Sequence, residues 1–270
     1  MYIRIAFSAL VMAMLAAMPN PAAADDSVIG TILEVEGTAT VTQQGKTPIT
    51  AAVDGAIHLN DRIETGPQSR VFILFIDNTQ WTLSENTKFT VDDYVYDADN
   101  NTDNKGRYSV LEGAFQYVSG LIAKKPNPDV QIETPAGSIG IRGTDITGGD
   151  IDGEYGIDVD EGAIDVTTDK GQVRVNAGEG TMVKGRQFAP SRPAKWKQER
   201  RDRLRQKVFL KRRELVQQRM TGAQERHKLM RERFKQYMLK HRKTQLQQLQ
   251  KPGQRKLFQP GQNFRRRYGQ

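Results

Sequence analysis

The chain contains no cysteine and only three histidines among its 270 residues. The absence of cysteine excludes disulfide bonds, cysteine-ligated zinc, iron–sulfur clusters and thiol nucleophiles. The histidines, His58, His227 and His241, do not have the spacing of metal ligands, and no two carboxylates are spaced as an acid–base pair. The sequence therefore predicts a protein that is not an enzyme and that needs no metal or cofactor.

Long apolar runs are also scarce. The longest, Ala6 to Met18, ends at Pro19-Asn20-Pro21, before the roughly 20 residues that a transmembrane helix requires. Arg4 precedes this run, and Ala22-Ala23-Ala24 places small residues before Asp25, as at a signal-peptidase site. We expect residues 1–24 to be a cleaved signal peptide rather than an uncleaved anchor. The mature chain would then begin at Asp25, lack a transmembrane span and be periplasmic or otherwise exported.

Positive and negative charges are unevenly divided along the chain. Residues 25–190 carry 13 Lys and Arg against 27 Asp and Glu, a net charge of −14. Residues 191–270 carry 26 against 5, a net charge of +21. A split of this size indicates an acidic module joined to a basic interaction segment, with the boundary near Ser191.

The acidic part, residues 25–190, has the pattern of an all-β domain. Short β-branched or aromatic runs are separated by Gly, Pro, Asn and Asp, and no helical period of 3.6 occurs from Val28 to Val183. The clearest strand, Val71 to Ile76, has six apolar residues in succession, which predicts burial on both faces. The expected fold is a sandwich or a solenoid-like stack of short strands.

A Glu-Gly dipeptide opens three of the β-rich stretches, at Glu36-Gly37, Glu112-Gly113 and Glu161-Gly162. Their unequal spacing excludes a simple periodic array but allows stacked hairpins, with glycine supplying a positive φ at each turn. The alternative is that Glu-Gly is a common turn dipeptide with no structural repeat behind it.

Seven stretches of this region form an ordered pattern. They are Gly30-Thr31-Ile32, Glu36 to Val41, Asp61 to Val71, Thr87-Lys88-Phe89, Glu112-Gly113, Thr134 to Asp145 and Glu161 to Val166. The pattern resembles the FecR domain, and its most specific parts are the stretches around Thr65 to Val71 and Thr134 to Asp145. The turn residues that match the family pattern are Gly66, Pro135, Gly140, Gly143, Thr144 and Gly162.

The resemblance implies an all-β, extracytoplasmic bacterial domain of signalling or envelope-associated proteins, without catalytic activity. The iron-uptake regulators that give the family its name have a cytoplasmic segment and a membrane span before the domain. In this chain we expect a signal peptide before the domain instead. The resemblance therefore assigns the domain to this chain but not the role of the iron-uptake regulators.

Three short motifs resemble catalytic or ligand-binding motifs, but each lacks a residue or a structural element that the motif requires. Ser138 lies in a variant of the nucleophile elbow, which needs a strand-to-helix turn and a partner histidine. The loop Asp97 to Asp103 resembles a calcium loop but has Thr102 where glycine is needed. Gly45-Lys46-Thr47 lacks the first glycine of a phosphate-binding loop.

A cluster of acidic residues leaves two alternatives open. It could hold a hard cation at neighbouring strand ends, or it could be a solvated edge whose charges prevent strand pairing. Its members are Asp150, Asp152, Glu154, Asp158, Asp160 and Glu161.

The basic part changes to a helical pattern. Ser191-Arg192-Pro193 resembles a helix start, and residues 191–250 are almost free of β-branched residues. Thr221-Gly222 interrupts this region, which allows either a hairpin of two helices or one long helix with a weak point. Residues 251–270, rich in Gln, Gly, Arg and aromatics, predict a disordered tail.

The basic part suggests two functions. In the first, it engages an anionic surface such as lipid headgroups, lipopolysaccharide or a wall polymer, while the β domain binds or scaffolds a protein partner in the envelope. The residues expected at that surface are Arg200, Arg201, Arg203, Arg205, Lys211, Arg212, Arg213, Arg231, Arg233, Lys235, Arg265, Arg266 and Arg267. In the second, it binds the acidic β domain of the same or another copy, giving autoinhibition or oligomerisation. Export argues against nucleic acid as the partner.

Overall fold

The computed structural model describes residues 28–99, 102–229 and 232 and divides the chain into two units, residues 1–221 and 222–270. The described residues of the second unit are helical. The first unit contains fifteen strands, a short 3-10 helix and α2. The strands are β1 (Val28–Glu36), β2 (Ala39–Thr42), β3 (Ile49–Thr50), β4 (Ala56–His58), β5 (Arg62–Thr65), β6 (Arg70–Phe75), β7 (Gln80–Leu83), β8 (Lys88–Val95), β9 (Lys105–Glu112), β10 (Phe115–Val118), β11 (Asp129–Thr134), β12 (Gly137–Ile151), β13 (Glu154–Thr168), β14 (Gly171–Asn176) and β15 (Gly180–Val183). The labelled helices are η2 (Ile122–Lys124) and α2 (Gln198–Lys207), and a further helix begins at residue 213.

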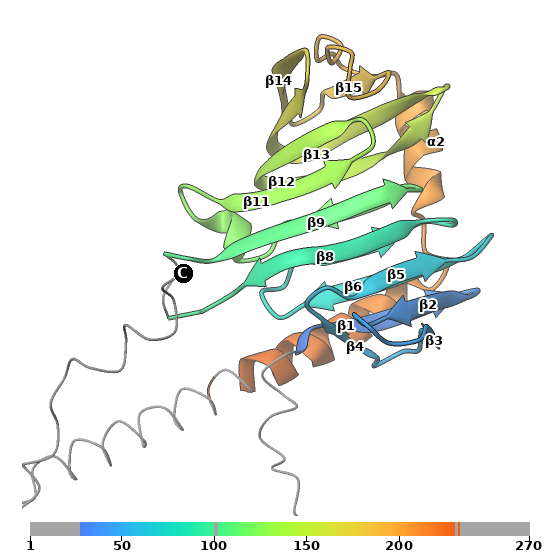
Figure 1. Ribbon diagram of the computed structural model, residues 1–270, viewed down its shortest axis with the longest axis vertical. Coiled ribbons are helices and arrows are strands. Elements are labelled where there is room, and N and C mark those ends of the chain that lie inside the picture. The colour runs from blue at the N-terminus through green and yellow to red at the C-terminus, as the bar shows by residue number, and fades with distance from the viewer. Residues whose placement is uncertain (1–27, 100–101, 230–231, 233–270) are drawn as a thin grey trace, which may run out of the picture. The chain divides into compact units, whose positions relative to one another are not determined.

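The strands form one sheet that curls into two facing layers (Figure 1). The first layer has the order β3-β2-β5-β8-β9-β11, and the second has the order β4-β1-β6-β7-β10. The long strand β12 joins them, because residues 137–140 pair with β11 and residues 145–148 pair with β10. An irregularity between Arg142 and Asp145 bends β12 at the crossing. β13 follows β12 through both layers, and β14 and β15 pair with its two halves, so the all-β prediction is confirmed.

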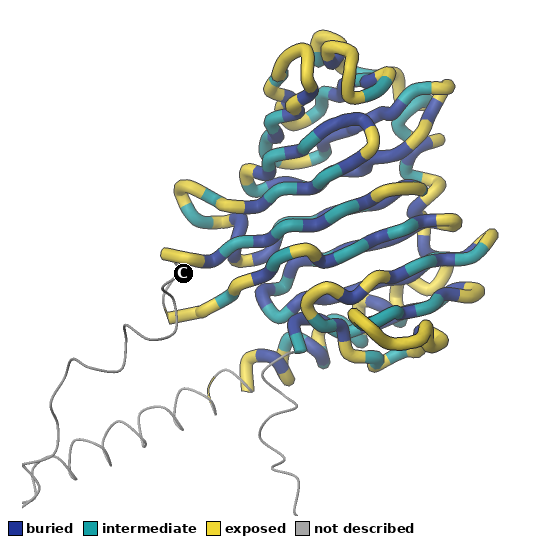
Figure 2. The backbone as a smooth tube through the Cα atoms, viewed as in Figure 1, coloured by how far each residue is buried: buried dark blue, intermediate teal, exposed yellow. Residues whose placement is uncertain are grey.

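The core lies between the layers and is centred on Trp81. The indole ring lies 4.7 Å from Phe89, 4.9 Å from Tyr108 and 5.1 Å from Tyr117, measured between ring centroids. Tilted and edge contacts of this kind stabilise aromatic pairs beyond the burial of their area. In β8 and β9, buried and partly exposed residues alternate (Figure 2), as expected when one face of a strand meets the core and the other meets solvent.

β6 departs from this alternation, as its apolar run predicts. Val71 and Ile73 face the central core, whereas Phe72 and Leu74 are buried on the opposite face of the second layer. The prediction of burial on both faces is therefore confirmed. The outer face of the second layer must be covered by another part of the chain, which the next subsection describes.

The glycines of the three Glu-Gly dipeptides have the predicted positive φ, but none closes a hairpin, because two lie between strands that do not pair with each other and the third lies inside β13. Gly37, Gly113 and Gly162 have φ values of 80°, 85° and 75°. Gly37 and Gly113 each lie against a hydroxyl-bearing residue of the neighbouring turn, Ser69 and Thr87 respectively, and a Cβ at either glycine would overlap that residue. The dipeptide therefore marks positions where positive φ and close stacking of turns coincide.

Asp77 is a buried carboxylate that fixes the connection between β10 and β11. Its side chain accepts hydrogen bonds from Thr79, Tyr94 and the backbone N–H of Ile122. Burial raises the pKa of Asp77, and these hydrogen bonds lower it only in part. Because the folded-state pKa lies above the unfolded value, the stabilising contribution of the protonated form is lost as pH rises through the folded-state pKa.

We expect Asp77→Ala to lower the free energy of unfolding by about 2 to 4 kcal/mol at neutral pH, because several buried donors lose their acceptor. Asp77→Asn keeps an acceptor without a charge and should cost less. Urea unfolding between pH 3.5 and 8 checks this. The wild type should lose stability relative to Asp77→Asn as pH rises, and a pH-independent difference would contradict the role of the charge.

The basic part begins differently from the prediction. Ser191 does not cap a helix: its backbone N–H donates to Met182 and its hydroxyl accepts from the Met182 N–H, while Ala194 pairs with Gly180. These residues extend the edge of β15, so α2 starts only at Gln198. The next helix starts at residue 213, which places the break at residues 208–212 rather than at Thr221-Gly222.

The expected signal peptide, residues 230–231 and 233–250 of the basic helical region, and the tail 251–270 lie outside the described residues. Within the part of the chain that the structure describes, no helix has the length and apolar character to span a membrane.

Candidate functional site: an arginine-rich segment on an acidic sheet face

Five carboxylates on the outer face of the second layer form what we call the acidic track. They are Glu34 and Glu36 of β1, Asp152 in the turn after β12, and Asp158 and Asp160 of β13. Residues 191–221, here called the docked segment, run across this face, and α2 packs against β12 (Figure 1). The side chains of Asp158 and Glu34 are 0% and 1% exposed, so the segment removes both carboxylates from water.

Arg201 and Arg205 of α2 bind the centre of the track. Arg201 donates to Asp158 at 2.9 Å and to Asp160 at 2.7 Å, and Arg205 reaches the same two carboxylates. Residues four apart share one face of a helix, and residues two apart share one face of a strand. The two arginines and the two aspartates therefore form a compact cluster of charge-assisted hydrogen bonds.

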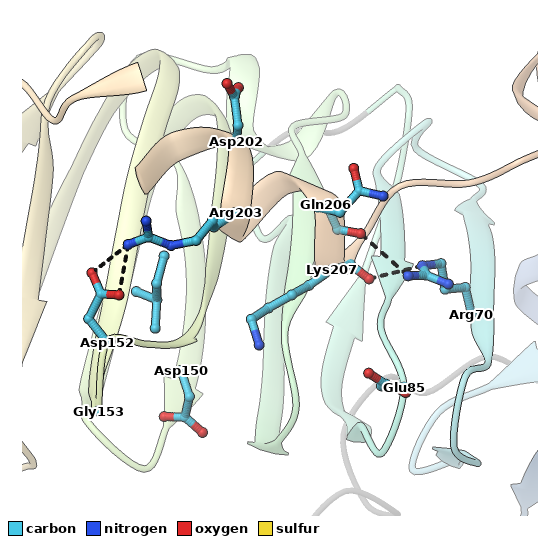
Figure 3. A pocket seen from close by; sticks show the side chains of 10 residues that line it. Arg70, Glu85, Asp150, Asp152, Gly153, Asp202, Arg203, Gln206 and Lys207 are labelled. Carbon is cyan, nitrogen blue, oxygen red and sulfur yellow. Dashed lines mark hydrogen bonds and ion pairs between the residues drawn. The ribbon is translucent and has the colours of Figure 1, made fainter. Parts of the chain in front are cut away.

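Asp152 and Trp196 hold the start of α2. Arg203 donates to both carboxylate oxygens of Asp152 at 2.7 and 3.0 Å (Figure 3), and Arg200 adds a third contact at 3.1 Å. The Arg200 guanidinium also lies 5.4 Å from the centre of the Trp196 ring. That ring rests on Gly180, where a Cβ would overlap it, so glycine is needed for this approach.

Arg70 of β6 binds the other end of α2. Its guanidinium donates to the carbonyl oxygens of Gln206 and Lys207 at 3.3 and 2.9 Å (Figure 3). Carbonyls of the last helical turn lack partners within the helix and carry partial negative charge, so a cation at this place stabilises the helix. An open groove of about 760 Å³ lies beside this contact, with Arg70, Glu85, Asp150 and Lys207 among its lining residues.

Glu34 and Glu36 bind the part of the segment that follows α2. Glu36 accepts the backbone N–H groups of Lys211 and Arg212 at 2.7 and 3.3 Å, just before the next helix. Glu34 pairs with Arg219 at 2.5 Å and with Arg212 at 3.4 Å. The first Glu-Gly dipeptide thus contributes a carboxylate that receives the segment, in addition to the turn glycine.

Apolar side chains complete this interface. Leu204, Val208, Leu210 and Val216 of the segment are buried without belonging to the central core. The same is true of Leu33, Phe72 and Leu74 on the outer face of the second layer. The segment therefore supplies the cover that the two-sided burial of β6 requires.

At the centre of the acidic track, some buried polar atoms have no hydrogen-bond partner. Burial raises the pKa of Asp158, and the hydrogen bond and charge of Arg201 compensate only in part. Burial alone would lower the pKa of Arg201, but its bonds to Asp158 and Asp160 raise it overall. One oxygen of Asp158, the Nε of Arg205 and one oxygen of Glu36 are buried without a hydrogen-bond partner. Each such atom carries an uncompensated loss of hydration.

The acidic cluster was expected either to hold a cation or to be a solvated strand edge, and the structure shows a third arrangement. Asp152, Asp158 and Asp160 bind arginines of the same chain instead of a cation or bulk solvent. Among the described residues, no group of His, Asp and Glu is arranged to hold a metal ion. Ser138 lies within β12 and its hydroxyl donates to Glu133, so the strand-to-helix turn of a nucleophile elbow is not formed.

The thirteen residues predicted to bind an anionic surface fall into three groups. Arg200, Arg201, Arg203, Arg205 and Arg212 form ion pairs with the acidic track. Lys211 contacts it through its backbone, and Arg213 lies 5.6 Å from the ring centre of Phe209. Arg231, Arg233, Lys235, Arg265, Arg266 and Arg267 lie outside the described residues. The sequence reasoning did not include Arg219, Trp196 or Arg70.

The predicted turn residues occupy other places. The N–H of Gly66 donates to Thr38, and Gly143, with φ of 65°, lies against Gly162 where β12 and β13 bend. Thr144 exchanges hydrogen bonds with Ser119, Pro135 lies in the turn between β11 and β12, and Gly140 lies inside β12. These residues shape the sheet and do not contact the docked segment.

The arrangement of two layers joined by β12 and β13 can now be compared with known proteins. Residues 61–184 match the family model of the FecR protein. The chain carries a FecR domain. FecR domains are signalling and regulatory domains of the bacterial envelope. The matched range includes Asp152, Asp158 and Asp160, whereas Glu34, Glu36 and the docked segment lie outside it.

Two solved structures also match the chain. Both are crystal structures of a "putative anti-sigma factor" from Parabacteroides distasonis ATCC 8503, at 2.50 Å and 1.65 Å resolution, with 12% and 13% identity and TM-scores of 0.40 and 0.39. Each match covers 50% of this chain and 59% of the other. No curated protein matches the chain.

Proposed function

We propose that this chain is a non-enzymatic, exported regulatory module of the bacterial envelope whose FecR domain is covered on one face by its own basic segment. The observation that carries the proposal is the binding of Arg201 and Arg205 across Asp158 and Asp160. A domain of net charge −14 and a docked segment of net charge +9, with 12 Lys and Arg against 3 Asp and Glu, supply the attraction. The segment acts as an autoinhibitory cover, because the face that it hides becomes available to a protein partner only after it leaves.

The covering is tested by amide hydrogen exchange of residues 198–207 in the expected mature chain, Asp25 to Gln270. We expect these amides to be protected at low ionic strength and to lose at least tenfold in protection in the variant Arg201→Gln/Arg205→Gln, because charged hydrogen bonds contribute roughly 1.5 to 3 kcal/mol each. The matched control is Lys195→Gln/Lys197→Gln, which removes the same charge from two exposed lysines. Exchange at free-peptide rates in the wild type would refute the proposal.

A second candidate function is attachment to an anionic surface through residues that follow the docked segment. Residues 222–270 carry 14 Lys and Arg against 2 Glu, a net charge of +12. Near an anionic membrane each basic residue contributes about 1 kcal/mol, so this excess is ample for attachment. Lipopolysaccharide phosphates and acidic wall polymers present the same chemistry.

We expect the mature chain to co-sediment with anionic vesicles and not with zwitterionic vesicles, and to be released by high salt. Replacing Arg265, Arg266 and Arg267 by Gln should weaken binding roughly a hundredfold, since about 3 kcal/mol is removed. The control replaces Lys88, Arg142 and Arg174 of the sheet by Gln. Equal binding to both kinds of vesicle would contradict this second function.

A further inference from the structure

We propose that residues 198–221 of the docked segment exchange between two copies of this chain, so that α2 of one copy lies on the acidic track of the other. This inference rests on the proposed function, because it uses the same contacts. The exchanged contact would pair Arg201 and Arg205 of one copy with Asp158 and Asp160 of the second. Each copy has one track and one segment, so two copies satisfy each other reciprocally and form a closed, symmetric pair.

The chemistry of the interface permits exchange. Most of its specific contacts are arginine–carboxylate pairs, which form equally well when the two partners belong to different chains. Leu204 of α2 and Val208, Leu210 and Val216 after it are buried on the sheet of one copy. The same face of the second copy buries these four side chains again after the exchange. Salt screens the charge pairs of this interface. The segment can therefore leave one copy and bind another at moderate ionic strength.

The fit within one chain leaves polar groups unsatisfied. One oxygen of the fully buried Asp158, the Nε of Arg205 and one oxygen of Glu36 have no hydrogen-bond partner. Buried polar atoms are paired in most proteins, so the fit of the segment to the track of its own copy leaves room for improvement. A segment that arrives from another copy is not limited by the connection to that domain.

The chain also has a suitable hinge at Lys197. Before it, Ala194 pairs with Gly180 and the Trp196 ring rests on the same glycine, so the chain is fixed to the sheet up to this point. Lys197 itself is extended, with φ of −61° and ψ of 146°, and its side chain makes no capping hydrogen bond to α2. A change of backbone angle here moves α2 without disturbing a strand.

The absence of cysteine from the chain makes the test specific. Asp152 and Arg203 are in contact and partly exposed, so Asp152→Cys and Arg203→Cys place two thiols within reach of a short bismaleimide. One full-length mature chain carries both substitutions and reports docking within a copy. A mixture of two chains, each with one substitution, can be cross-linked only between copies, and Arg201 and Arg205 remain in both to hold the segment.

We expect the mixture to give a covalent product of twice the chain mass. Each single-substitution chain alone, and a mixture in which Arg174→Cys replaces Asp152→Cys, should give none, because residue 174 lies on the first layer. Cross-linking within the doubly substituted chain, without product in the mixture, would overturn exchange and leave the proposed function intact. No cross-link in either sample would overturn both.

Discussion

Ending the chain after Trp196 is expected to destabilise the FecR domain strongly and to make it aggregate. The truncation removes Leu204, Val208, Leu210 and Val216 from the interface, each of which contributes about 1.5 to 3 kcal/mol when fully buried. After the entropy of ordering the segment is subtracted, we expect a loss of about 5 kcal/mol in the free energy of unfolding. Urea unfolding and light scattering measure the two effects.

The matched control for this truncation is a chain that ends at Leu229. It keeps the whole docked segment and should unfold at the same urea concentration as the mature chain. If the chain that ends at Trp196 were as stable and soluble as this control, the segment would not be part of the folded domain. The outer face of β6, with Phe72 and Leu74, would then need another explanation for its burial.

Gly162→Ala is expected to be the most damaging substitution at a glycine with positive φ. Gly162 has φ of 75°, and a Cβ at this position would overlap the carbonyl oxygen of Gly143 where β12 and β13 bend. Positive φ costs an alanine about 1 kcal/mol, and forcing the two backbones apart adds roughly 1 to 3 kcal/mol. Thermal unfolding should show a fall in Tm well beyond that of an ordinary glycine substitution.

Gly178→Ala separates the cost of a positive φ from the cost of the overlap between the two backbones. Gly178 has φ of 82°, but a Cβ there meets nothing within 4 Å. It should therefore lose only the roughly 1 kcal/mol that positive φ costs. Equal losses at both glycines would show that the contact with Gly143 has no part in stabilising the bend.

The class of fold could be predicted because it depends on local patterns. The apolar run of β6, the absence of helical periodicity and the positive φ of the Glu-Gly glycines each depend on a few neighbouring residues, and the structure confirms all three. The order of strands in the layers could not be predicted in this way. It depends on the irregularity near Arg142 that bends β12, and no residue type marks this bend unambiguously.

The docking of the basic segment was one of two interpretations that charge alone allowed. Asp158 and Asp160 lie two residues apart on a strand, and Arg201 and Arg205 lie four apart on a helix, so each pair presents one charged face. Both patterns are visible in the sequence. Their pairing joins positions more than forty residues apart, however, and nothing in the sequence selects these partners over solvent or an external surface.

The start of the basic helix shows how tertiary contacts override a local signal. Ser191 followed by Arg192-Pro193 has the composition of a helix start. The free edge of β15 offers backbone partners to Ser191 and Ala194, and these hydrogen bonds replace the cap. The helix is displaced to Gln198, where Arg70 and the acidic track hold it at several points.

The central claim, that arginines of the segment are bound by carboxylates of the same FecR domain, is tested most directly by a double-mutant cycle on Asp158 and Arg201. The free energy of unfolding is measured for the wild type, Asp158→Asn, Arg201→Gln and the double variant. We predict a coupling energy of at least about 1 kcal/mol. The same cycle on Asp165, which pairs with Arg174 on the first layer, and Arg201 should show none. Strict additivity for Asp158 and Arg201 would contradict the account.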